Sequence, residues 1–169
     1  MKRNLRKTKN RGFTLIEALV AIAILTISIA GPITIASRGL ASAVFARDQI
    51  TAFYLAQEAV EFIRNKRDGN NLEDNPWTDG LTGCLDGKVC TIDSKNNEIN
   101  ECIGGTCPVL KYDDSTAFYS YDSGDDSNFT REVRMTTINV KEIAITTTLS
   151  WSSGSITKSF TVKEHILDW

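Results

Sequence analysis

Hydrophobic and polar positions divide the chain into segments with different periodicities. Residues 13–35 are almost entirely apolar and carry one charge, at Glu17. A helix of that length is about 35 Å long, enough to cross the roughly 30 Å hydrocarbon core of a bilayer. The pattern therefore predicts a membrane-spanning helix. Gly31 and Pro32 lie near its outer end, where proline removes a backbone hydrogen bond, so we expect a bend or local unwinding there.

Residues 36–67 continue the helical pattern but add a polar side. Lys66 and Arg67, followed by Gly69, suit the C-terminal end of a helix, so we expect the helix to stop at residues 65–68. An apolar stripe of this kind favours packing against a small sheet. Its positions recur at steps of three and four: Phe53, Ala56, Val60 and Ile63.

Residues 129–169 alternate apolar and polar side chains, which indicates strands with one buried face. Ser153-Gly154 predicts a hairpin turn between the last two strands, because glycine accepts a positive φ. No crossover helices separate the strands, so we predict an α+β fold in which a long N-terminal helix packs on a small C-terminal antiparallel sheet. The expected inward positions are Val133 and Met135, then Ile143, Ile145, Thr147, Leu149 and Trp151, then Ile156, Phe160 and Val162.

Residues 68–128 are rich in Asn, Asp, Gly and Ser and are predicted to be mostly loops. They hold all four cysteines, whose position after a membrane crossing indicates disulfides in an oxidising compartment: Cys84, Cys90, Cys102 and Cys107. Three pairings are possible, and glycine-containing turns within each neighbouring pair favour local bridges. A zinc site is the alternative. Its structural knuckles prefer two to four intervening residues, and the first pair here is separated by five.

The balance of charge limits the choice of partners. The chain has 19 basic and 21 acidic residues, and six of the bases lie within its first eleven residues, so the remainder holds 13 bases against 21 acids. Phosphate binding needs clustered Lys and Arg, so we predict no nucleic-acid partner.

Candidate chemistry is sparse elsewhere. Carboxylates suit calcium, but the spacing of the acidic residues in the loop region matches no EF-hand, so we predict no metal site. His165 is the only histidine, and the sequence contains no nucleophile, metal-protease or phosphate-loop motif. We therefore predict no cofactor and no enzymatic activity. The acidic residues considered are Asp113, Asp114, Asp122, Asp125 and Asp126.

The junction between the basic leader and the apolar segment carries the most specific signal. Gly12 is followed by Phe13-Thr14-Leu15-Ile16-Glu17. A carboxylate inside a membrane span costs about 2.5 to 3.5 kcal/mol or more and usually has a partner. Cleavage after Gly12 would create a charged amine on Phe13, four residues from Glu17. This arrangement resembles the type IV prepilin and type II secretion pseudopilin family.

The resemblance implies a set of site residues and partners. A prepilin peptidase would cleave between Gly12 and Phe13 and methylate Phe13, and Glu17 would pair with such an amine during filament assembly. The implied partners are other pilin or pseudopilin subunits, a membrane platform protein and an assembly ATPase. The implied location is the bacterial cytoplasmic membrane, with the C-terminal domain outside the cytoplasm, and then the filament.

Several alternatives stay open on the sequence alone. The stretch from Ala52 to Ala59 and the strand with Trp151 are similar to minor pilins or I-type minor pseudopilins, which favours a minor subunit over a major one. A pilus and a secretion pseudopilus are not distinguished. The functional alternative is an uncleaved, membrane-anchored extracytoplasmic binding module or enzyme. The expected segments are a leader at 1–12, an assembly helix at 13–35, its amphipathic continuation at 36–67, a disulfide-containing loop region at 68–128 and a sheet at 129–169.

Overall fold

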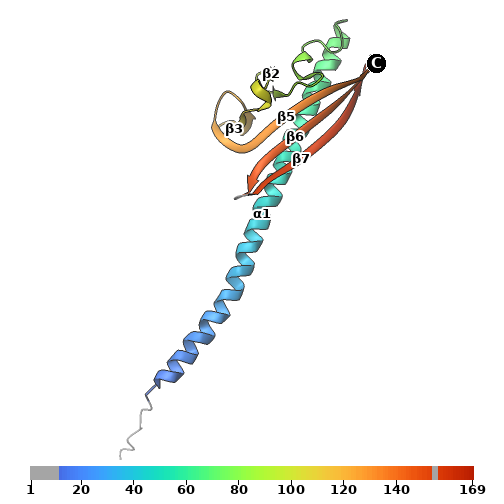
Figure 1. Cartoon of the computed structure of the whole chain (residues 1–169). Coiled ribbons are helices and arrows are strands. Elements are labelled where there is room, and N and C mark those ends of the chain that lie inside the picture. The colour runs from blue at the N-terminus through green and yellow to red at the C-terminus, as the bar shows by residue number, and fades with distance from the viewer. Residues whose placement is uncertain (1–11, 154–155) are drawn as a thin grey trace, which may run out of the picture. The chain divides into compact units, whose positions relative to one another are not determined.

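The computed structural model of the chain describes residues 12–153 and 156–169 (Figure 1). It contains two compact units, Met1–Val44 and Phe45–Trp169. One helix, α1, is continuous from Leu15 to Leu72. The basic residues of the predicted leader and Gly154 of the predicted hairpin turn lie outside the described residues.

The N-terminal part of α1 is apolar and exposed. Its large side chains face outward along its whole circumference; Leu15 is 82 % and Ile27 75 % exposed. The helix is long and apolar enough to cross a membrane. It passes through Gly31 and Pro32 without interruption, so the local unwinding expected there is not observed.

The C-terminal part of α1 has one buried face, as predicted. Ala52, Ala56 and Ala59 are fully buried, and their small side chains let the helix lie close to the sheet. Val60 and Ile63 join the main core, together with Val133 and Ile145 of the sheet. Phe53 differs from the prediction: it lies at the margin of the face and remains 40 % exposed.

The end of α1 lies beyond the predicted residues 65–68. The helix continues through Gly69 to Leu72 because Asn70 connects its last turn to the following loop by hydrogen bonds. The side-chain amide of Asn70 donates hydrogen bonds to the carbonyl oxygens of Trp77, at 3.1 Å, and Asp79, at 2.9 Å. Gly69 is therefore a helical residue rather than the cap.

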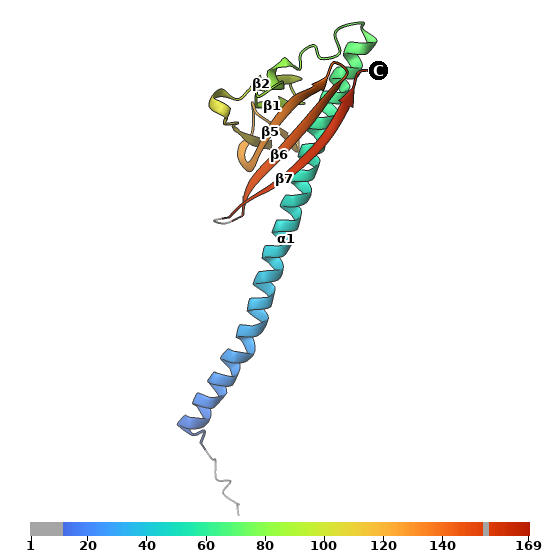
Figure 2. The same cartoon turned by 45° about the vertical axis from the view of Figure 1, so that its right-hand side comes forward.

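All described strands belong to one seven-stranded sheet with antiparallel pairing. Figure 2 shows β5, β6 and β7 lying side by side along the C-terminal part of α1. β6 pairs with both β5 and β7, and β5 also pairs with β1 and β3. The strands are β1 (Cys90–Asp93), β2 (Glu98–Glu101), β3 (Val109–Asp113), β4 (Phe118–Ser120), β5 (Asp125–Asn139), β6 (Glu142–Ser153) and β7 (Ile156–Leu167).

The region predicted as loops is more ordered than expected. It holds β1 to β4 and two short 3-10 turns, Thr82–Cys84 and Ile103–Gly105. These strands have only three to five residues, too few for a period of two to stand out. The long strand β5 likewise begins at Asp125 rather than at residue 129.

Burial along the last two strands follows the predicted alternation. Every predicted inward position of β6 is at most 3 % exposed. In β7, Phe160 and Val162 are half-buried, whereas Ile156 is 58 % exposed at the end of the strand. The pairing of β6 with β7 runs from Glu142–Leu167 to Ser153–Ile156, which is the geometry of a hairpin.

Candidate functional site

The predicted cleavage point lies just before the start of α1. Gly12, Phe13 and Thr14 belong to no helix or strand, and all three are exposed. Phe13 is 75 % exposed, and among the described residues none apart from its sequence neighbour lies within 4 Å of the Cβ position of Gly12. The peptide bond between Gly12 and Phe13 is therefore open to a peptidase.

Thr14 and Glu17 close the N-terminus of α1 as a capping box. The Thr14 hydroxyl accepts from the backbone N–H of Glu17 at 3.3 Å and donates to Glu17 Oε2 at 3.2 Å. The backbone N–H of Thr14 donates to the same carboxylate oxygen at 3.4 Å. This role was not predicted from the sequence, although Thr-x-x-Glu before an apolar run is a recognised signature of it.

The geometry leaves the Glu17 carboxylate available for another donor. A carboxylate has about four acceptor positions, and Thr14 occupies only one oxygen. Glu17 is exposed, and the first turn of a helix favours negative charge. The carboxylate is thus fixed on the helix and still able to bind an amine.

Hydroxyl groups within the apolar part of α1 are satisfied locally. Ser28 and Thr34, on either side of Pro32, donate to the carbonyl oxygens four residues earlier, at 2.7 Å and 2.9 Å. Thr26 and Ser37 donate to carbonyls three residues earlier. These hydrogen bonds satisfy the hydroxyl groups within the helix itself, so the four polar side chains are compatible with a membrane span.

The cysteines are joined as two local disulfides, the pairing that the glycine-containing turns favour. Cys84 bonds Cys90 across a Cα–Cα distance of 5.2 Å, and Cys102 bonds Cys107 across 4.9 Å. The first bridge lies in the main core with Val133 and Met135. The second closes a short loop and forms a small separate cluster with Val89.

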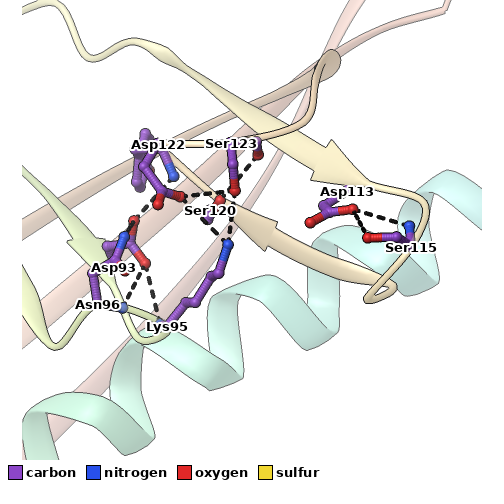
Figure 3. Close-up of polar contacts among 9 residues, drawn as sticks. Asp93, Lys95, Asn96, Asp113, Ser115, Ser120, Asp122 and Ser123 are labelled. Atoms are coloured by element: carbon purple, nitrogen blue, oxygen red, sulfur yellow. Dashed lines mark hydrogen bonds and ion pairs between the residues drawn. The ribbon is translucent and has the colours of Figure 1, made fainter.

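Two of the acidic residues of the loop region, Asp113 and Asp122, are bound to nearby donors (Figure 3). Asp113 accepts from the backbone N–H and hydroxyl of Ser115, which lowers its pKa. Hydrogen bonds from Ser120 and Asn96 lower the pKa of Asp122. Within the described ranges, no group of three His, Cys, Asp or Glu residues is placed to hold a metal ion.

A buried carboxylate organises the turn beside them. Asp93 is 4 % exposed, and its two oxygens accept from the backbone of Lys95 and of Asn96 and from the side-chain amide of Asn96. Its Oδ2 also accepts from the backbone N–H of Tyr121 at 3.0 Å. Asp93 therefore fastens the β1–β2 turn to the segment between β4 and β5.

Arg131 is a buried cation that joins the helix to the sheet. It lies on the inward face of β5 and is 1 % exposed. Its guanidinium donates to the carbonyl oxygens of Leu55 in α1, at 2.8 Å, and of Ile92 in β1. Glu58 Oε2 lies 3.5 Å away, and burial raises the pKa of Glu58 despite that positive charge. Arg131 follows buried Phe129 at a two-residue step, so the strand period places it on the same inward face, but its burial was not predicted from the sequence.

His165 lies on the exposed side of β7. Its Nδ1 is 2.7 Å from Glu142 Oε1 across the β6–β7 pair. The contact with His165 lowers the pKa of Glu142. Both groups are accessible to water, so this is a surface pair and does not form a catalytic cleft.

The comparison with known families agrees with the N-terminal geometry. Residues 7–31 match the family model of the prokaryotic N-terminal methylation motif. No curated protein and no solved structure matches the chain. The chain therefore carries a type IV pilin signal, joined to the pilin-like combination of a long apolar helix and a C-terminal antiparallel sheet.

The motif at residues 7–31 indicates what the N-terminal part of the chain does. It implies processing by a prepilin peptidase and assembly with other pilin subunits. It points to a structural subunit rather than an enzyme. The exposed apolar helix that follows is consistent with anchoring in a membrane through the N-terminus.

Proposed function

We propose that the chain is a minor structural subunit of a type IV pilus or of a type II secretion pseudopilus. The observation that supports this most directly is the matched motif at residues 7–31. The exposed Gly12–Phe13 bond, the capped Glu17 and the long apolar helix add to that support.

In the proposed first step, the precursor is held in the cytoplasmic membrane by residues 13–35. The peptidase hydrolyses the bond between Gly12 and Phe13, which removes the basic leader and leaves a free amine on Phe13. A methyl group is then transferred to this amine from a sulfonium donor, which leaves as a neutral thioether, and the amine releases a proton. The C-terminal unit, Phe45–Trp169, lies outside the cytoplasm, where its four cysteines are oxidised.

In the proposed second step, the apolar N-terminal part of α1 leaves the bilayer and joins a bundle of equivalent helices. The Phe13 amine of one subunit pairs with the Glu17 carboxylate of a neighbour. Either charge alone in an apolar bundle would cost several kcal/mol, so the pairing selects one axial position for each new subunit. A platform protein and an assembly ATPase drive this step from the membrane and the cytoplasm.

The experiment that tests the proposal is intact mass spectrometry of the protein from cells that produce it. We expect loss of residues 1–12 and one added methyl group on Phe13. Gly12→Val places a branched side chain beside the cleaved bond, and this variant should keep its full length. The alternative, an uncleaved membrane-anchored module, predicts that the wild-type chain also keeps residues 1–12.

The minor role is tested by counting subunits. Quantitative mass spectrometry of purified filaments should find this chain at a small fraction of the abundance of the principal subunit. A filament built mainly of this chain would instead make it a major pilin.

A further inference from the structure

The outer face of β5 carries an acceptor sequence for N-linked glycosylation. Asn128-Phe129-Thr130 fits the Asn-x-Ser/Thr pattern with no proline between, and it is the only such triplet in the chain. The pattern is frequent by chance, so its meaning depends on how the fold presents the asparagine. A glycan at this position would be a modification separate from N-terminal processing and assembly.

The strand presents the acceptor residues to solvent. Phe129 and Arg131 point inward and are 3 % and 1 % exposed. Asp126 and Asn128, at alternate positions, are exposed, and Thr130 is half-buried. The amide of Asn128 and the hydroxyl of Thr130 therefore share the outward face, where one enzyme can contact both.

A bulge releases Asn128 from regular pairing. The register between β3 and β5 passes from Val109–Thr130 directly to Lys111–Asp126. Three residues of β5 therefore lie opposite one residue of β3, and Asn128 is the middle one. On the other side, pairing with β6 begins only at Phe129, opposite Trp151. Bulges of this kind redirect side chains and often lie at functional positions.

The side-chain amide of Asn128 is only weakly held. It donates to the carbonyl oxygen of Ser152 across 3.4 Å, at the long limit for a hydrogen bond. The bulge itself is stabilised by Ser127, whose hydroxyl accepts from the backbone N–H of Phe129 at 3.1 Å. Ser127 therefore stabilises the backbone of the bulge, while Asn128 Nδ2 makes only one long hydrogen bond.

We propose that Asn128 is the acceptor of an N-linked glycan, transferred from a polyprenyl-diphosphate carrier on the extracytoplasmic side of the membrane. A bond forms between Asn128 Nδ2 and the anomeric carbon of the first sugar. The bond between that carbon and the diphosphate oxygen breaks, and the diphosphate leaves with the electron pair. The amide proton passes to a base on the transferase. This proposal rests on the export of the C-terminal unit.

The test uses the full chain purified from the cells that produce it. Trypsin should release a peptide from Tyr112 to Arg131, and fragmentation should place a glycan on Asn128. Asn128→Gln and Thr130→Val should abolish the added mass, because they remove the acceptor amide and the recognised hydroxyl. Thr130→Ser should retain it. Asn139→Gln is the matched control: an exposed asparagine near the end of the same strand, without a hydroxyl residue two positions later.

Three results would overturn the proposal: an unmodified Asn128, a glycan on a serine or threonine of the same peptide, or a glycan on Asn128 that survives Thr130→Val. Measurements on the same purified protein distinguish failure of the glycan proposal from failure of the proposed function. If Asn128 is unmodified but the cysteines are oxidised and Phe13 is methylated, only the glycan proposal falls. If the cysteines are reduced and residues 1–12 remain, both fall.

Discussion

At the scale of single residues, Glu17 combines two interactions. Its carboxylate caps α1 through Thr14, and we propose that it also neutralises the Phe13 amine of a neighbour. Glu17→Gln separates these roles, because glutamine also closes a capping box but carries no charge. We expect normal cleavage of this variant, but incorporation into sheared filaments should fall roughly tenfold or more, since about 1.4 kcal/mol corresponds to a factor of ten.

The control for this variant is Glu61→Gln. Glu61 lies on the same helix and pairs with Arg64 on the exposed surface. Its substitution should leave filament incorporation unchanged. Wild-type incorporation of Glu17→Gln, measured beside that control, would remove charge pairing from the assembly mechanism.

Arg131 is the residue whose loss should destabilise the domain most clearly. Arg131→Met removes the side-chain donor to the carbonyls of Leu55 and Ile92 and leaves the half-buried Glu58 without its cation. We expect the free energy of unfolding to fall by about 3 kcal/mol, measured by denaturant titration. Adding Glu58→Leu to the same chain should recover part of that loss, because the uncompensated carboxylate disappears.

A surface arginine on the same strand provides the comparison. Arg134 is exposed and pairs with Glu132, so Arg134→Met should change the free energy of unfolding by less than about 1 kcal/mol. Equal effects of Arg131→Met and Arg134→Met would mean that the buried contacts contribute nothing beyond a surface pair.

Glu142 gives a prediction about pH. Its pKa lies below the ordinary value of 4.5, chiefly because His165 contacts its carboxylate. A depressed acidic pKa favours the folded state above the unfolded pKa, and this contribution is lost as the pH falls through the folded pKa. In an NMR titration the midpoint of Glu142 should lie below 4.5 and rise toward that value in His165→Phe. An unchanged midpoint in that variant would exclude His165 as the cause.

At the scale of structural elements, the two disulfides close loops of similar length in different surroundings. Their sequence separations are six and five residues, so loop entropy alone predicts about 2 kcal/mol for each. Replacing Cys84 and Cys90 by alanine should cost more than replacing Cys102 and Cys107, because only the first pair lies in the main core. Thermal unfolding of the two double variants measures the difference, and equal losses would contradict it.

The elements with a clear period were predictable from sequence. Buried Ala56 and Val60 in α1, and Ile143 to Trp151 in β6, lie where the steps of three to four and of two place them. The strands between residues 90 and 120 were not predicted, because each is too short to show a period. The end of α1 was misplaced because the tertiary hydrogen bonds of Asn70 outweigh the usual preference for glycine as a cap.

The candidate site was predictable only in part. Gly12, Phe13 and Glu17 lie within one six-residue motif, so their candidate roles can be predicted directly from the sequence. The capping role of Thr14 was readable from the same letters but was overlooked. The roles of Asp93 and Arg131 depend on partners far away in the chain, and a single sequence contains no local pattern that pairs them.

At the scale of the whole molecule, the core belongs entirely to the C-terminal unit. All residues of the main hydrophobic clusters lie between Ala52 and Ile166. We therefore expect a fragment of residues 45–169 to fold without the apolar N-terminal part of α1. Circular dichroism should show one cooperative thermal transition, and a thiol reagent should find no reactive cysteine. A fragment with no transition would show that the N-terminal part of α1 is required for folding.

The contacts of Arg131 also constrain the order in which this unit is completed. Its two carbonyl acceptors lie 76 and 39 residues away in the sequence, in α1 and β1. A guanidinium that has lost water without reaching these acceptors is costly, so intermediates in which only two of the three elements have docked are disfavoured. We therefore expect this closure to be concerted. A folding chain would then be either open to proteases or fully assembled, with few partly docked forms between the two states.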